Sequence, residues 1–227
     1  MKDAAPSKGD LNSGRLICIV GPSGAGKDSV IDYAKANLPS GIEVRFARRT
    51  ITRPSQSGGE NHEAVTEEEF KRLLSCGAFV LHWSANGLSY GIRRGLHEWL
   101  AADRTVVVSG SREHLPVLRA EFPRAEVVLI TAPREVLQQR LTGRGRERPE
   151  AVGKRLERSQ RLGDAVPGAR TILNTGALET AGEALIALLA GNRAAQSSLA
   201  REEIKFPKME SKLTEEWRRY WVSTIRS

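Results

Sequence analysis

Short apolar runs, separated by segments with the spacing of amphipathic helices, organise most of this 227-residue chain. The runs are rich in β-branched residues and lie at 16–20, 44–47, 79–83, 105–109, 127–131 and 171–173. The first of them, Leu16–Val20, contains no charged side chain, as expected for a strand that is buried on both faces. Repeated strand and helix segments predict an α/β fold with a mainly parallel sheet flanked by helices.

Two helix starts can be recognised from local signals. Thr66 is followed three residues later by Glu69, a capping box that predicts a helix continuing through Leu74. Pro133 suits the first turn of a helix that runs to Leu141, since an N–H group at that position would have no helical partner.

The pattern divides the chain into three parts. Residues 1–13 are polar and contain Gly, Ser and Pro, which predicts a disordered leader, and residues 14–191 form the α/β domain. Residues 192–227 form a C-terminal extension with one apolar stripe on a basic helix. The stripe consists of Met209, Leu213, Trp217, Trp221 and Ile225. We expect this tail to dock on its own domain, on a second copy of the chain as a homodimer, or on another protein; a membrane surface or disorder are the alternatives.

The segment after the first apolar run has the layout of a phosphate-binding P-loop. Gly21-x-x-x-x-Gly26-Lys27 stands between the predicted strand and a helical pattern. Glycines let backbone N–H groups turn towards phosphate oxygens at a helix N-terminus, and Lys27 would reach the β- and γ-phosphates. The alternative is a glycine-rich turn with a purely structural role. We predict nucleotide contacts from Gly21, Pro22, Ser23, Gly24, Ala25, Gly26, Lys27, Asp28 and Ser29.

Asp28 stands where Ser or Thr normally offers a hydroxyl to Mg²⁺. A carboxylate next to a triphosphate is repelled unless a divalent cation lies between them, so Asp28 is the predicted metal-side group. Ser29 is the other candidate, but adjacent side chains on a helix diverge by roughly 100°. Asp28 could also simply be a helix N-terminal charge favoured by the macrodipole.

The net charge of +8 is concentrated in one segment. Residues 140–161 carry eight Lys and Arg against three Glu, and none of them is aromatic. A basic segment without interleaved aromatic residues, downstream of a P-loop, fits a phosphate clamp better than a nucleic-acid footprint. We therefore predict an arginine-rich lid and no nucleic-acid partner.

The remaining composition narrows the class of protein further. Two cysteines, one of them in the first apolar run, predict no disulfide framework and fit a reducing cytoplasm. No apolar stretch approaches the roughly 20 residues of a membrane span, so none is predicted.

Four further clusters carry polar and aromatic side chains that suit a second substrate. They are RTITRP at 49–54, GGENH at 58–62, HWSANGLSYG at 82–91 and SGSR at 109–112. The last follows a predicted strand at its carboxyl end, the edge at which open α/β sheets bind ligands.

Together these motifs resemble the guanylate-kinase-like P-loop kinases, and within them the phosphokinases of ribose 1,5-bisphosphate. The resemblance covers about residues 15–189 and is most specific in GPSGAGKDS, ITRP, GGENH, HWSANGLSYG and GSR. Guanylate kinases typically have Arg, Asp-Tyr and Asp where this chain has Gln56, His62 and Ser109, which argues against guanine as the acceptor base. Ser109 also departs from the phosphokinase pattern, in which we expect Asn.

The resemblance implies that the chain uses ATP and Mg²⁺ to phosphorylate a small sugar phosphate, α-D-ribose 1,5-bisphosphate. The products would be ADP and 5-phospho-α-D-ribose 1-diphosphate, in the breakdown of phosphonates through the carbon–phosphorus lyase route. Lys27, Arg144 and Arg146 would be catalytic, with Arg155 as a further lid candidate, and Asn174 would border adenine. The implied substrate residues are Arg49, Arg53, Glu60, Asn61, His62, Tyr90, Ser109 and Arg112.

Two alternatives stay open. A nucleoside monophosphate kinase such as guanylate kinase is disfavoured by Gln56, His62 and Ser109. A non-catalytic guanylate-kinase-like binding module, which would recruit partners through its Trp-bearing tail, has no need of an intact Gly26-Lys27 or of an arginine-rich lid.

Overall fold

The computed structural model describes residues 13–55, 60–143, 153, 155, 157, 158, 161, 162 and 165–191. The predicted C-terminal extension, 192–227, and all but the last residue of the predicted leader lie outside the described residues. So do Arg144 and Arg146, two of the predicted catalytic residues, and Gln56.

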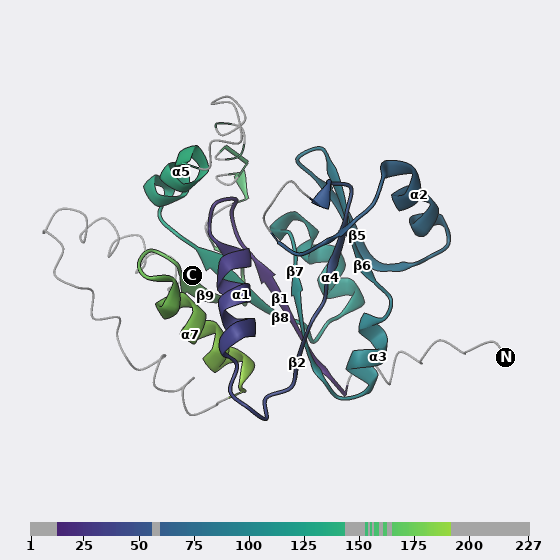
Figure 1. Ribbon diagram of the computed structural model, residues 1–227, viewed down its shortest axis with the longest axis horizontal. Helices are drawn as coiled ribbons and strands as arrows, with labels where there is room; N and C mark the ends of the chain where they lie inside the picture. The colour runs from purple at the N-terminus through teal and green to yellow at the C-terminus, as the bar shows by residue number, and fades with distance from the viewer. Residues whose placement is uncertain are drawn as a thin grey trace, which may run out of the picture. The chain divides into compact units, whose positions relative to one another are not determined.

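Five parallel strands form the main sheet, in the order β2-β7-β1-β8-β9 (Figure 1). They are β1 (Arg15–Val20), β2 (Val44–Phe46), β7 (Thr105–Ser109), β8 (Glu126–Thr131) and β9 (Arg170–Leu173). Every neighbouring pair in this sheet is parallel. The predicted mainly parallel sheet is therefore confirmed, and its central strand β1 is the run that enters the P-loop.

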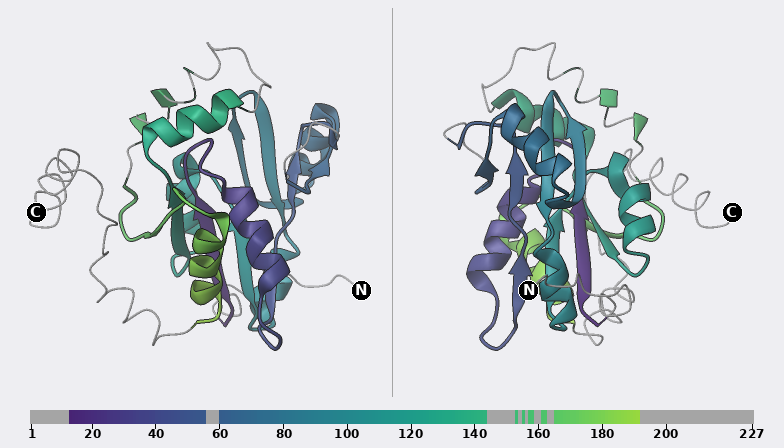
Figure 2. Two further views of the ribbon diagram at one scale, coloured as in Figure 1. Left: turned by 60° about the vertical axis from the view of Figure 1, so that its left-hand side comes forward. Right: turned by 90° about the vertical axis from the view of Figure 1, so that its right-hand side faces the viewer.

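Helices cover both faces of this sheet because the side chains of β1 alternate between them. On one face, Ile17 and Ile19 pack with apolar residues of α1, α5 and α7, and α1 lies beside α7 (Figure 2). On the other face, Leu16, Cys18 and Val20 pack with residues of α3 and α4. The helix bounds are α1 (Lys27–Asn37), α3 (Leu96–Ala101), α4 (Leu115–Glu121), α5 (Arg134–Gly143) and α7 (Leu178–Leu189).

Cys18 lies in the core strand β1, as predicted for it. Cys18 is buried and Cys76 is exposed, and both are free thiols. Burial raises the pKa of the Cys18 thiol to about 12, so this thiol stays neutral and acts as a small core side chain.

A second sheet, of four strands, has the order β4-β3-β6-β5. Its strands are β3 (Arg49–Ile51), β4 (Glu63–Ala64), β5 (Phe79–Ala85) and β6 (Leu88–Arg93). The run at 79–83 is thus a strand as predicted, but it pairs antiparallel with β6 and does not belong to the parallel sheet. The reason is the two-residue turn Asn86-Gly87, in which both residues have positive φ, 52° and 74°, as a tight hairpin requires.

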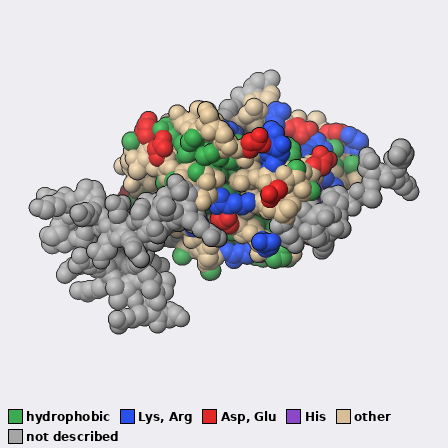
Figure 3. All heavy atoms as spheres, turned by 90° about the horizontal axis from the view of Figure 1, so that it is seen from below, with side chains coloured by type: hydrophobic (Ala, Val, Ile, Leu, Met, Phe, Trp, Pro, Cys, Tyr) green, Lys and Arg blue, Asp and Glu red, His purple; other side chains and the backbone are tan. Residues whose placement is uncertain are grey.

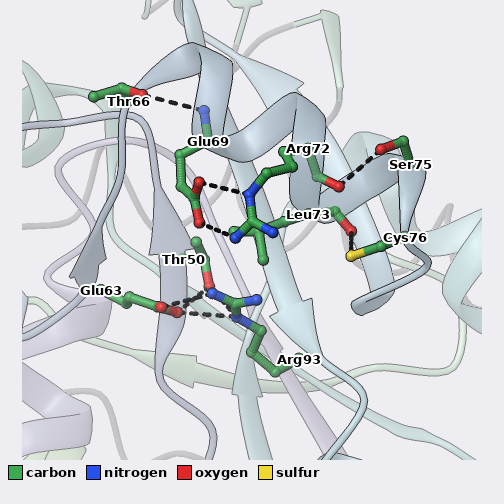
Figure 4. A network of polar contacts seen from close by, with 9 residues as sticks. All are labelled: Thr50, Glu63, Thr66, Glu69, Arg72, Leu73, Ser75, Cys76 and Arg93. Carbon is green, nitrogen blue, oxygen red and sulfur yellow. Dashed lines mark hydrogen bonds and ion pairs between the residues drawn. The ribbon is translucent and has the colours of Figure 1, made fainter.

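A polar network ties the second sheet together (Figure 4). Arg93 donates to both carboxylate oxygens of Glu63, at 2.6 and 3.0 Å, and the buried Thr50 hydroxyl donates to the same carboxylate at 2.6 Å. The neighbouring helix α2 (Glu67–Ser75) begins at the predicted cap, where the Glu69 N–H donates to Thr66 Oγ1 at 3.1 Å. The predicted N-cap at Thr66 is confirmed, but the Glu69 carboxylate pairs with Arg72 rather than bonding back to the cap, and the helix ends one residue later than predicted.

The helix predicted to run to Leu141 also exists. It is α5, which begins directly after Pro133 and continues two residues further, to Gly143. The Pro133 carbonyl accepts from the Leu137 N–H at 3.0 Å, so proline stands at the position where only its carbonyl is needed.

Lys and Arg side chains alternate with Asp and Glu side chains on the described surface seen in Figure 3. They do not gather into one basic patch on that face. Among the helices of the described residues, none is both long and apolar enough to cross a membrane.

Candidate active site

The P-loop connects β1 to α1 with glycines at points where no side chain fits. A Cβ at Gly21 would lie 2.0 Å from the carbonyl oxygen of Ile130, on the adjacent strand β8. Gly26 has φ 79°, a left-handed conformation at the N-cap of α1. The loop therefore has the backbone geometry that leaves the first N–H groups of α1 available to an anion.

Lys27 folds back over this loop. Its ammonium donates to the carbonyl oxygens of Gly21 at 3.1 Å and Pro22 at 3.3 Å. Burial is the main reason why the pKa of Lys27 is lowered to about 8; Arg49 and Arg112 act in the same direction, whereas Asp28 and Glu60 act in the opposite direction. Phosphate groups bound in the loop would favour the charged form of this amine.

Asn174 holds the P-loop from the end of β9. Its amide Nδ2 donates to the carbonyl oxygen of Ala25 at 2.8 Å, and the residue is 4% exposed. A Cβ at Gly26 would lie 2.5 Å from the same Nδ2, so the amide lies directly against the loop backbone. The predicted contact of Asn174 with adenine stays a prediction.

Arg49 connects the P-loop to the second sheet. Its Nη2 lies 3.6 Å from Asp28 Oδ1 and 2.5 Å from Glu60 Oε2, and its Nε donates to the same Glu60 oxygen at 2.8 Å. The guanidinium also lies over the ring of Tyr90, 5.4 Å from the centroid. Residues from three separate motifs, the P-loop, RTITRP and GGENH, therefore meet around one guanidinium group.

These residues border a cleft of about 240 Å³ beside α1. Its polar lining consists of Asp28, Asp32, Lys35, Arg48, Arg49, Glu60, Asn61 and Ser109. Glu60 Oε1 and Ser109 Oγ are buried atoms without a hydrogen-bond partner in the described part of the chain. A ligand that supplies hydroxyl donors and anionic groups would match this lining.

His62 and Arg53 stabilise the loop that contributes Glu60. His62 is 4% exposed, and its Nε2 lies 2.9 Å from the Arg53 carbonyl oxygen. Its Nδ1 lies 3.1 Å from the Glu60 carbonyl oxygen and 3.3 Å from Arg53 Nη2. Both ring nitrogens thus have partners within the protein, and the predicted contact of His62 with substrate stays a prediction.

Aromatic rings extend the site along the second sheet. Trp83 and Tyr90 stack across β5 and β6 with centroids 5.4 Å apart, and Trp83 also faces His114 at 5.6 Å. Trp83 and Trp99 are partly buried against the core. Arg112 is 9% exposed and follows β7 in the short 3₁₀ helix η3 (Arg112–His114).

Two arginines near the P-loop come from the basic segment. Arg155 Nη1 donates to Ser23 Oγ at 3.0 Å, which supports its selection as a lid candidate. Arg140 lies on α5 near the P-loop: its Nη1 is 3.9 Å from the position that a Cβ on Gly26 would take. That nitrogen is buried and lacks a partner among the described residues. The sequence indicates Arg140 only as one of eight basic residues.

A P-loop, a parallel sheet and an attached second sheet together are typical of P-loop kinases of the guanylate kinase type. The guanylate kinase family model matches residues 13–190, so the chain belongs to the guanylate kinase family. The crystal structure of guanylate kinase from Anaplasma phagocytophilum has the same fold, with a TM-score of 0.56, 18% identity and coverage of 87% of this chain and 97% of that one.

Within that family, the chain is similar to proteins named ribose 1,5-bisphosphate phosphokinase PhnN. The protein of that name from Thiobacillus denitrificans is 40% identical over 190 residues, 84% of this chain and all of the relative. The one from Agrobacterium fabrum is 44% identical over 174 residues, 77% of this chain and 95% of the relative. At this identity and coverage, the chain belongs to the same family as these phosphokinases.

Proposed function

We propose that the chain transfers the γ-phosphoryl group of ATP to the 1-phosphate of α-D-ribose 1,5-bisphosphate, giving ADP and 5-phospho-α-D-ribose 1-diphosphate. The observation that carries the proposal is the polar cleft beside the P-loop, which offers Arg48, Arg49 and Glu60 to one acceptor. The similarity to proteins named ribose 1,5-bisphosphate phosphokinase supports this choice of acceptor. Operation in phosphonate breakdown belongs to the same proposal.

The acceptor needs no strong general base. Its phosphate has a second pKa of about 6 and is largely ionised at neutral pH, so an oxygen of that phosphate can attack directly. Ser109, at the end of β7, cannot act as a carboxylate base, and the proposed reaction does not require one.

Catalysis would then depend on positioning and charge neutralisation. Lys27 would hold the β- and γ-phosphates, and Arg155, which contacts Ser23 of the loop, would meet charge that develops on the transferred group. Arg144 and Arg146 are proposed to share this role. For an arginine that acts in this way, loss of the guanidinium costs about 10³ to 10⁵ in rate.

Asp28 is the proposed metal-side residue. No cluster of three or more metal-ligating side chains occurs in the described residues, and Mg²⁺ in kinases usually takes only one or two carboxylates besides substrate phosphates. The Asp28 side chain is 43% exposed and adjoins the loop, so it could supply one such carboxylate. When bound, Mg²⁺ would neutralise charge on the nucleotide phosphates, and Arg49, 3.6 Å from Asp28 Oδ1, would help to hold that carboxylate in place.

Glu60 supplies a contact that suits a sugar. Its Oε2 accepts from Arg49, whereas its Oε1 is buried at the cleft without a donor among the described residues. A ribose hydroxyl would satisfy that oxygen, and Arg49 and Arg53 would face the acceptor's phosphates.

The test is turnover with two acceptors. The purified chain is incubated with ATP, Mg²⁺ and either ribose 1,5-bisphosphate or GMP, and ADP and the phosphorylated product are followed by ³¹P NMR. We expect product from the sugar bisphosphate alone, its loss in Lys27→Ala, and full activity in Lys71→Ala, an exposed lysine on α2. Product from GMP would identify a guanylate kinase instead, and ATP binding without any turnover would favour a binding module.

A further inference from the structure

Two arginines of one helical segment contact different parts of the site. Gly153, Arg155, Glu157, Arg158 and Arg161 are helical, and the Leu162 N–H donates to the Arg158 carbonyl oxygen at 3.2 Å. Residues three positions apart lie on the same face of a helix, so the side chains of Arg155 and Arg158 leave it as neighbours. Arg155 contacts the P-loop through Ser23, whereas Arg158 makes its contacts elsewhere.

Arg158 binds two partners with three nitrogens. Its Nε donates to Glu113 Oε1 at 2.8 Å and its Nη2 to Glu113 Oε2 at 2.5 Å, which is a bidentate pair. Its Nη1 donates to Asn86 Oδ1 at 3.1 Å. The hydrogen bond from Arg158 is the main reason why the pKa of Glu113 is lowered, so this carboxylate is ionised at neutral pH.

Both partners belong to elements on the acceptor side. Asn86 is in the turn between β5 and β6, the strands that carry Trp83 and Tyr90. Glu113 is in η3, which follows Ser109 and begins at Arg112. Arg158 therefore joins the acceptor-side hairpin and η3 to the helical segment whose neighbouring arginine contacts the P-loop.

The partial exposure of the Arg158–Glu113 ion pair indicates that the pair fixes an orientation rather than stabilising the fold. The side chains of Arg158 and Glu113 are 23% and 44% exposed, and ion pairs this close to solvent contribute little to folding. A fork that is fixed at three nitrogens nevertheless restrains orientation strongly. We therefore expect loss of this ion pair to change the position of the helical segment but not the stability of the fold.

We propose that Arg158 is a positioning residue, which fixes the helical segment against Asn86 and Glu113 so that Arg155 reaches the phosphate end of the site. The inference rests on the proposed function in one respect, because Arg155 must act on the transferred phosphoryl group. It adds a residue that couples the acceptor-side elements to the phosphoryl side.

The kinetic test is a double-mutant cycle of Arg155→Ala and Arg158→Ala. Displacement of a catalytic group by about 1 Å can cost about 10²-fold, so Arg158→Ala should lower kcat by about that factor while the KM for ATP changes little. If Arg158 acts through Arg155, the double variant should be no slower than Arg155→Ala alone. Losses that multiply in the double variant would overturn the proposal.

Two single variants sharpen the cycle. Arg158→Lys keeps the charge but cannot form the bidentate fork, so it should be nearly as slow as Arg158→Ala. Lys71→Ala removes one positive charge at an exposed position on α2, outside the basic segment, and it should leave kcat within about twofold, as is usual away from functional groups. Restoration of activity by lysine would overturn the proposal.

A second readout does not depend on the acceptor. Amide hydrogen exchange of the full chain should become faster at the 86–89 turn and at 112–115 in Arg158→Ala and Arg158→Lys, but not in Lys71→Ala, with the melting temperature unchanged. If no acceptor supports turnover, the proposed function fails while this measurement still tests the anchoring contact. Unchanged exchange in those two segments would refute it.

Discussion

Replacement of Asn174 by Ala removes the one side-chain contact by which the end of β9 holds the P-loop in the described structure. The Ala25 carbonyl oxygen loses its donor and is left in a buried position, since Ala25 is 0% exposed. The predicted result is a less stable fold and a loop that is less well organised to receive phosphates.

The magnitude follows from the burial of this contact. A buried carbonyl left without a partner costs about 1–3 kcal/mol, so the free energy of unfolding in urea should fall by that amount. About 1.4 kcal/mol corresponds to a factor of ten in an equilibrium constant. If half of this cost falls on the bound conformation of the loop, affinity for phosphate ligands should fall by about two- to twelvefold.

The assay compares ATP with inorganic tripolyphosphate, which has the phosphates and no base. Isothermal titration calorimetry of wild type and Asn174→Ala should give equal losses of affinity for both ligands, because the loop is common to them. Thr175→Ala, at the exposed next residue, is the matched control. A loss for ATP alone would refute the loop-holding role and would favour the contact with adenine that the sequence predicts for Asn174.

Three further predictions concern pH, a helix cap and core packing. Because the pKa of Lys27 is lowered to about 8, mainly by burial, the free protein loses this positive charge above that pH, and its affinity for ATP should fall about tenfold from about pH 7 to about pH 9. Lys27→Arg keeps its charge over this range, so its affinity should not change with pH. A flat profile in the wild type would contradict the prediction. Thr66→Ala should lower the free energy of unfolding in urea by about 0.5–2 kcal/mol through loss of the α2 cap, whereas Thr66→Ser should not. Gly91→Ala should cost about 1–3 kcal/mol in the same assay because its Cβ would lie 2.4 Å from the Phe79 ring, and an unchanged midpoint would show that the ring can move aside.

The main sheet could be predicted from the sequence because its signals are local. Leu16–Val20 is wholly apolar and stands directly before the glycines of the P-loop, so strand, turn and helix follow one another in a single stretch. The cap at Thr66 is equally local, since donor and acceptor are three residues apart.

The second sheet could not be predicted in the same way. β3 (Arg49–Ile51) has only three residues and begins with an arginine, and polar residues interrupt β6 (Leu88–Arg93), so neither is a run of apolar residues. One available signal, the Asn86-Gly87 dipeptide between two β-rich stretches, does indicate the hairpin that joins β5 to β6.

In the candidate site too, residues in recognisable motifs could be predicted, whereas contacts that depend on tertiary packing could not. Chemistry and motif suggest that Arg49, Glu60 and Asp28 belong to one site, and the structure brings these three together. The bond from Asn174 to Ala25 depends on the packing of β9 beside β8, and the pairing of Arg158 with Glu113 joins residues 45 positions apart. Contacts of this kind depend on tertiary packing, which a single sequence does not reveal.

The attachment of the second sheet has a consequence for how such enzymes can diversify. The chain leaves the main sheet after β2 and returns to it in β7, and these two strands are hydrogen-bonded neighbours, with the Ala47 N–H donating to the Val107 carbonyl oxygen at 2.8 Å. Residues 48–94 form an insertion between them, and its two ends lie close together because Arg49 pairs with Ile92 where β3 and β6 run antiparallel, the arrangement in which inserted segments are best tolerated. Under the proposed function, exchange of this insertion would alter the choice of acceptor while the register of the strands around the P-loop is inherited unchanged.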